Sequence, residues 1–118
     1  MRALISAVAL GVSISLAIAP AQAKSLSRII AEMGLSPADF EMMGTAAASL
    51  YQDVTPRAGS QASWSNPDTR SHGTVTLREA SGGCVRLTHE MFPKGEPADR
   101  RIRLRFCKAS DGRWVLQP

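Results

Sequence analysis

The sequence predicts an α+β protein, in which N-terminal helices pack on a small twisted antiparallel sheet of four or five strands closed by one disulfide. Three observations in the 118-residue chain support this fold class. Apolar residues recur with helical spacing as far as residue 51, and short alternating segments separated by turn residues follow. Cys84 begins one of these alternating segments, and Cys107 lies near the end of the next.

The first 23 residues have the pattern of a cleavable signal peptide. Arg2 precedes an apolar stretch, and Ala21-Gln22-Ala23 is the small-x-small pattern that signal peptidase reads. We therefore expect an exported protein beginning at Lys24, periplasmic or secreted, with outer-membrane association as a further option. An uncleaved membrane anchor stays open as the alternative, since the apolar stretch is about as long as the ~17-residue lower limit for a spanning helix.

Residues 24–58 are expected to form a helical N-terminal segment. Four apolar residues between Ser25 and Met33 have the spacing i, i+3, i+4 and i+7, which predicts a short helix with one apolar face. Ser36 is a suitable N-cap, Pro37 suits the first helical position, and Asp39 favours the positive end of the helix dipole. A second helix is therefore predicted from Pro37 to about Tyr51.

Residues 59–118 are expected to form a β domain. Glycine, proline and serine interrupt the helical periodicity here, and apolar and polar residues alternate between the breaks. Ser81-Gly82-Gly83 and Asp111-Gly112 are turn signals. The expected strands are Gln61–Ser65, Gly73–Glu79, Cys84–Met91, Arg101–Lys108 and Trp114–Leu116.

The two cysteines can set the register of the third and fourth strands. An even cysteine pair in an exported protein predicts a disulfide, and placing Cys84 opposite Cys107 fixes every other pairing. One side of the hairpin then pairs Val85 with Phe106, Leu87 with Leu104 and His89 with Ile102. The other side pairs Arg86 with Arg105, Thr88 with Arg103 and Glu90 with Arg101. One register sorts apolar from polar residues on both strands, and the expected core is Val75, Leu77, Val85, Leu87, Leu104, Phe106 and Trp114.

The same register gathers arginines on the polar side of the hairpin. The chain has a formal net charge of +4, and arginine's planar fork suits phosphate, sulfate and carboxylate groups. The candidate anion- or partner-binding residues are Arg86, Arg101, Arg103 and Arg105. The alternative is a solvated face whose charges are met by Glu79, Glu90 or acidic residues of neighbouring loops.

Catalytic and metal-binding patterns are not found in the sequence. Cys84, His89 and Cys107 could be considered as zinc ligands, but their spacing does not support such a site. Trp64 and Trp114 could stack on sugars, although core positions are the better interpretation in a chain with so few aromatic residues. We therefore expect no catalytic site, no metal site and no cofactor.

The segment from about Gly59 to Gln117 resembles the C-terminal domain of the rickettsial seventeen-kilodalton surface antigen family of proteobacterial envelope proteins. The residues that carry the resemblance are Trp64-Ser65-Asn66-Pro67-Asp68-Thr69, Gly73-Thr74-Val75, Cys84-Val85-Arg86, Phe106-Cys107-Lys108 and Asp111-Gly112-Arg113-Trp114. Arg70 stands where this family usually has glycine. The resemblance implies an envelope-associated β domain and supplies no biochemical activity.

The expected function is that of a non-enzymatic exported envelope protein, a binding or structural module with an arginine-rich face. Its partner would be an envelope component or a protein, with an anionic character suited to the arginines. We expect no nucleic acid as partner and no integral membrane span after cleavage, and the oligomeric state stays open. The alternative is a secreted inhibitor or virulence factor that binds a protein through the loop Met91–Arg100.

Overall fold

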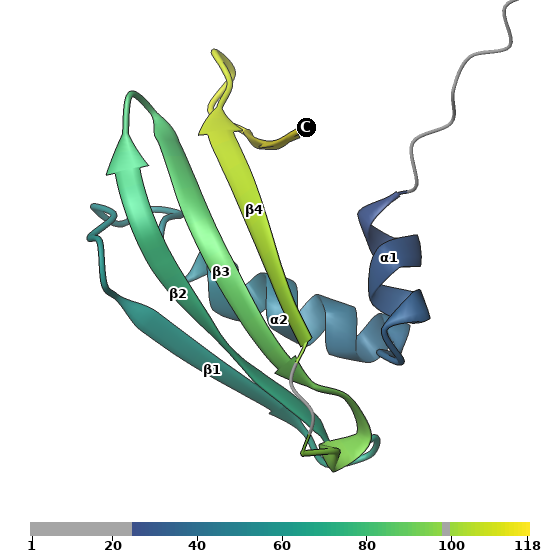
Figure 1. Cartoon of the computed structure of the whole chain (residues 1–118). Coiled ribbons are helices and arrows are strands. Elements are labelled where there is room, and N and C mark those ends of the chain that lie inside the picture. The colour runs from purple at the N-terminus through teal and green to yellow at the C-terminus, as the bar shows by residue number, and fades with distance from the viewer. Residues whose placement is uncertain (1–24, 98–99) are drawn as a thin grey trace, which may run out of the picture.

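The computed structural model describes residues 25–97 and 100–118, so the expected signal peptide, residues 1–23, lies outside the described residues. Two helices and an antiparallel sheet form within the described ranges, which confirms the predicted α+β class (Figure 1). The elements are α1 (Leu26–Glu32), α2 (Pro37–Ala48), β1 (Gln61–Asn66), β2 (Ser71–Ser81), β3 (Cys84–Phe92), the 3-10 turn η1 (Pro93–Gly95), β4 (Arg100–Lys108) and β5 (Trp114–Gln117).

The sheet is a five-stranded meander in which each strand pairs with its neighbours in sequence, in the order β1-β2-β3-β4-β5. The predicted β3–β4 register is confirmed, from Cys84 opposite Cys107 to Glu90 opposite Arg101. Gly82 and Gly83 form the two-residue turn between β2 and β3, with φ of 60° and 75°, a conformation that glycine adopts without steric cost. The disulfide between Cys84 and Cys107 is confirmed as well.

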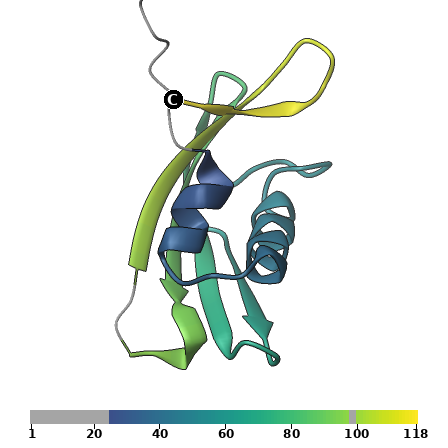
Figure 2. The ribbon, with the colours of Figure 1, turned by 90° about the vertical axis from the view of Figure 1, so that its right-hand side faces the viewer.

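Both helices lie on one side of the sheet (Figure 2). The helix α2 begins as predicted, because Ser36 caps it and Pro37 occupies its first position. It ends at Ala48, three residues earlier than predicted, with Ser49 as its C-cap. Leu50 and Tyr51 extend the apolar periodicity of the helix because both are buried. They lie in the turn that follows α2 and contact the sheet from there.

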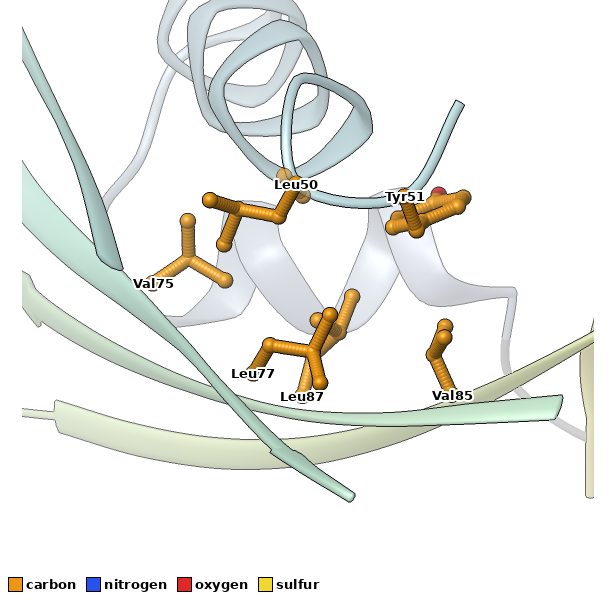
Figure 3. Packing of buried hydrophobic residues seen from close by; sticks show 7 residues of the cluster. Leu50, Tyr51, Val75, Leu77, Val85 and Leu87 are labelled. Carbon is orange, nitrogen blue, oxygen red and sulfur yellow. The ribbon is translucent and has the colours of Figure 1, made fainter. Parts of the chain in front are cut away.

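Two apolar clusters fill the space between the helices and the sheet. In the first, Leu50 and Tyr51 face the sheet (Figure 3), and the whole cluster is Ala47, Leu50, Tyr51, Val75, Leu77, Val85 and Leu87. The second consists of Ile30, Leu35, Met43, Trp64 and Met91, so the predicted core position of Trp64 is confirmed.

Three of the expected core residues are less buried than predicted. Phe106 and Trp114 are half-buried and pack against the first cluster, with ring centroids 5.9 and 4.9 Å from that of Tyr51. Leu104 is half-buried and belongs to neither cluster. These three residues are less buried because they lie on β4 and β5 at one edge of the sheet, whereas α2 covers β1 and β2.

The segment expected as the loop Met91–Arg100 is shorter than predicted. Met91 is fully buried and belongs, with Phe92, to β3, and the chain then turns through η1. The backbone N–H of Lys94 donates to the hydroxyl of the buried Ser71, at 2.9 Å, which fixes the turn on the start of β2. Arg100 already pairs with Met91 as the first residue of β4.

A buried carboxylate joins α2 to the β1–β2 hairpin. Asp39 is 1% exposed and accepts hydrogen bonds from the backbone of Ser36, from the amide of Asn66 at 2.8 Å and from the hydroxyl of Thr69 at 2.7 Å. Burial by itself raises the pKa of Asp39, but these hydrogen bonds outweigh it and hold the pKa below the ordinary value. The carboxylate therefore stays ionised inside the protein and links two elements that are distant in sequence.

Candidate anion-binding face

The helices cover only one face of the sheet, which we call the inner face, and the opposite, outer face carries arginines. Strand alternation sends Val85, Leu87 and His89 inward and the residues between them outward. On the outer face Arg86 lies opposite Arg105, Thr88 opposite Arg103 and Glu90 opposite Arg101. All four predicted site residues, Arg86, Arg101, Arg103 and Arg105, are exposed on this face, and their role in binding stays a prediction.

A fifth arginine joins them from the neighbouring strand. Arg78 of β2 points its guanidinium toward β3, with Nε 3.4 Å from the Thr88 hydroxyl oxygen. A bulge between Leu77 and Glu79 shifts the β2–β3 register at this point. Alternation after the inward Leu77 was the signal that could have found Arg78, but the cysteines set a register only for β3 and β4. We call Arg78, Arg86, Arg101, Arg103 and Arg105, with Thr88, the arginine face.

Two carboxylates lie on the same face, and each pairs with one arginine. Glu79 lies 3.5 Å from Arg86 Nε, and Glu90 accepts a hydrogen bond from Arg101 Nη2 at 3.0 Å. The Arg86 and Glu79 side chains are 63% and 60% exposed, so water screens their attraction strongly. Within residues 25–97 and 100–118 no carboxylate forms an ion pair with Arg78, Arg103 or Arg105. Glu79 and Glu90 therefore neutralise part of the charge on this face, as the alternative of a solvated face expects. The arginine face still carries an excess of positive charge.

The disulfide lies on the same face, at the end of the β3–β4 hairpin. The Nη2 group of Arg105 is 3.4 Å from Sγ of Cys84, so the arginine side chain lies against the bridge. The outer surface is also hollowed beside these residues. A depression of about 990 Å³ spans β2 to β4 and reaches the C-terminal residues, and all five arginines of the arginine face line it, together with Thr88 and Gln117.

The residues considered as zinc ligands do not come together as a ligand set. Cys84 and Cys107 are bonded to each other, and His89 points to the inner face, where it is 1% exposed. Burial lowers the pKa of His89 from 6.5 to about 4, so the imidazole is neutral at neutral pH. Within the described ranges, no group of three His, Cys, Asp or Glu residues could hold a metal ion.

The comparisons with known proteins leave the resemblance to the surface antigen family as a prediction. No protein-family model matches the chain, and searches of curated proteins and of solved structures give no match. Neither helix in the described part of the chain is long and apolar enough to cross a membrane.

Proposed function

We propose that this protein is a non-enzymatic module of the bacterial cell envelope, similar to surface antigens, that binds an anionic envelope component through the arginine face. The observation that carries the proposal is the composition of the outer face. Among residues 25–97 and 100–118, five arginines share this face with two carboxylates, and both carboxylates are already paired. An anionic partner would bind there without displacing any part of the inner-face core.

Cross-strand repulsion supports an anion between the strands. Like charges placed directly opposite each other on neighbouring strands destabilise a sheet, and Arg86 and Arg105 are such a pair. A phosphate, sulfate or carboxylate between two guanidinium groups reverses this repulsion and accepts charge-assisted hydrogen bonds from both. Arginine offers such hydrogen bonds in a fixed planar fork, which distinguishes it from lysine at such a position.

The expected export and the family resemblance support the part of the proposal that places the protein in the cell envelope. The signal-peptide pattern and the disulfide both favour an oxidising compartment outside the cytoplasm, periplasmic or secreted. Arg70, at the position where the surface antigen family usually has glycine, has φ of 62°, a left-handed conformation that favours glycine. In this proposal α1 and α2 stay packed on the inner face and leave the outer face to the partner.

Titration of the oxidised protein with dextran sulfate, and with neutral dextran as the control polymer, tests the proposal. We expect binding to dextran sulfate alone, falling steeply as salt is raised because screening weakens exposed charge pairs. The double variant Arg86→Ala/Arg105→Ala should bind about tenfold more weakly, since each lost charge-assisted hydrogen bond contributes a sizeable part of the affinity.

The matched control is Arg57→Ala/Arg113→Ala, which removes the same charge from exposed positions outside the arginine face. The control should bind nearly as well as the unchanged protein. Equal weakening in both double variants would mean that net charge alone attracts the polymer, and the arginine face would then have no special role.

A further inference from the structure

We infer that the depression on the arginine face binds a compact sugar carrying two phosphate groups. This inference deepens the proposed function, on which it rests, by naming the chemical class of the ligand. The depression measures about 990 Å³, at the upper end of the range typical of pockets for small molecules. Such a hollow fits a compact anion with several charges better than a long polymer running over a flat sheet.

The arginines form two pairs, each drawn from different strands. Arg86 of β3 and Arg105 of β4 are direct cross-strand neighbours. Arg78 of β2 and Arg103 of β4 come from the two strands that flank Thr88 of β3. Arg103 is the cross-strand partner of Thr88, and the Arg78 side chain contacts the Thr88 hydroxyl at 3.4 Å. Two guanidinium groups can bind one phosphate from two sides, each through its fork.

The two pairs are separated by one step of the strand alternation. Residues i and i+2 on one face of a strand lie roughly 7 Å apart, because each residue advances the strand by about 3.4 Å. Arg103 and Arg105 have this relation along β4, and Thr88 and Arg86 have it along β3. Two phosphate groups on one small scaffold therefore match the two arginine pairs, whereas a single phosphate can occupy only one.

Neutral hydrogen-bonding groups lie between and beside the arginines. The Thr88 hydroxyl contacts Arg78, and Thr88 pairs with Arg103 in the sheet. Gln117 lines the same depression and pairs with Arg105 across β4 and β5. Hydroxyl and amide groups can both donate and accept hydrogen bonds, as sugar hydroxyls do. The combination of two arginine pairs and these groups favours a hydroxylated scaffold over inorganic pyrophosphate.

Calorimetric titration of the oxidised protein with fructose 1,6-bisphosphate, fructose 6-phosphate and pyrophosphate tests the inference. We expect the bisphosphate to bind about tenfold more tightly than the monophosphate, because the second arginine pair adds charge-assisted hydrogen bonds. Pyrophosphate should also bind more weakly than the bisphosphate, since it lacks the hydroxyl groups. Equal affinity for all three anions would overturn the inference.

Two double variants locate the site. Arg78→Gln/Arg103→Gln should remove the preference for two phosphates and bring the bisphosphate to the affinity of the monophosphate. The control, Arg57→Gln/Arg113→Gln, should keep the preference intact. All four arginines are exposed, and a thermal melt of each variant confirms that the fold is retained.

A further arm distinguishes a free sugar phosphate from a lipid headgroup. Vesicles that contain a glycolipid with a bisphosphorylated disaccharide headgroup are compared with vesicles of equal charge made from a phospholipid with one phosphate. Tighter binding to the glycolipid vesicles than to fructose 1,6-bisphosphate assigns a lipid headgroup as the source, and the reverse order assigns a free sugar phosphate. Binding of dextran sulfate without any preference for two phosphates would overturn this inference alone, while loss of all anion binding would overturn the proposed function too.

Discussion

His89 is the single residue whose burial has the clearest effect on stability. It lies on the inner face opposite Val75 and Ile102, is 1% exposed, and its Nδ1 atom has no hydrogen-bond partner among the described residues. Burial lowers its pKa from 6.5 to about 4. The folded protein therefore keeps this imidazole neutral at a pH where the unfolded chain already binds a proton.

This difference predicts a loss of stability in mild acid. As the pH falls below 6.5, the unfolded state takes up a proton at His89 and the folded state does so only near pH 4. The free energy of unfolding should fall by about 2 kcal/mol between about pH 7 and about pH 5 from this group alone. Urea unfolding at a series of pH values measures the slope.

Two variants isolate the contribution of His89. The substitution His89→Leu should remove most of the slope between about pH 7 and about pH 5, because leucine carries no titratable group. The exposed His72, which stacks on Phe92 at 4.8 Å on the other face, serves as the control, and His72→Gln should keep the slope. A His89→Leu protein with an undiminished slope would contradict the prediction.

Among the elements, the β1–β2 pair is shaped by a close approach at Gly73. Trp64 lies opposite Gly73, and its indole occupies the space that a side chain at Gly73 would need. A Cβ atom there would lie 2.6 Å from the Glu90 carbonyl oxygen and 2.8 Å from Trp64 Nε1. The glycine thus lets the tryptophan fold over the strand into the second apolar cluster.

Gly73→Ala and Gly44→Ala should consequently change stability in opposite directions. Gly73→Ala forces a backbone contact that cannot relax cheaply, and we expect it to lower the free energy of unfolding by about 2 kcal/mol. Gly44 lies in α2 with no atom within 4 Å of an added Cβ, so Gly44→Ala should raise the free energy of unfolding by about 0.5–1 kcal/mol. Urea unfolding of the two variants checks both signs, and two changes of the same sign would contradict this account.

The sequence predicts most of the elements because their signals are local. Ser36 and Pro37 mark the start of α2, and Gly82 and Gly83 mark a turn, so these boundaries are confirmed. The predicted end of α2 was wrong by three residues. Leu50 and Tyr51 are buried and continue the helical spacing of apolar residues, although they lie in the turn that follows the helix. The bonds from Asn66 and Thr69 to Asp39 could not be predicted, since they depend on how α2 meets the hairpin.

For the molecule as a whole, the disulfide is the main covalent constraint. It joins residues 23 positions apart and closes the β3–β4 hairpin. In the chain-entropy model, opening a loop of this size costs roughly 3 kcal/mol of stability. The double variant Cys84→Ser/Cys107→Ser should therefore show a free energy of unfolding lower by about this amount in urea unfolding.

Reduction of the unchanged protein provides an independent comparison. The reduced protein should unfold at nearly the same urea concentration as the double serine variant. If the double variant is as stable as the oxidised protein, the disulfide does not constrain the unfolded chain in the way proposed.

The arginine face could be predicted only in part, and the reason lies in the whole sheet. The two cysteines are enough to fix the β3–β4 register, and this register places Arg86 beside Arg105 and Thr88 beside Arg103. The position of Arg78 on this face depends on the bulge that shifts the register between β2 and β3, and the cysteines do not fix that register. The depression depends on how several strands curve together, and that property of the assembled sheet has no signal in a short stretch of sequence.

The meander order also bears on how the chain acquires its fold. Each strand finds its partner in the segment just before it, so strand pairing is more local in sequence than in a sheet with crossovers, and more local pairing favours faster folding. If the chain becomes available for folding from its N-terminus onward, each new strand can pair with the edge formed by the strand before it. Both helices must wait for later segments, because Asp39 of α2 binds partners 27 and 30 residues later and Ile30 of α1 packs with Trp64 and Met91. The strand β5, joined to β4 by four residue pairs, is the last and smallest addition.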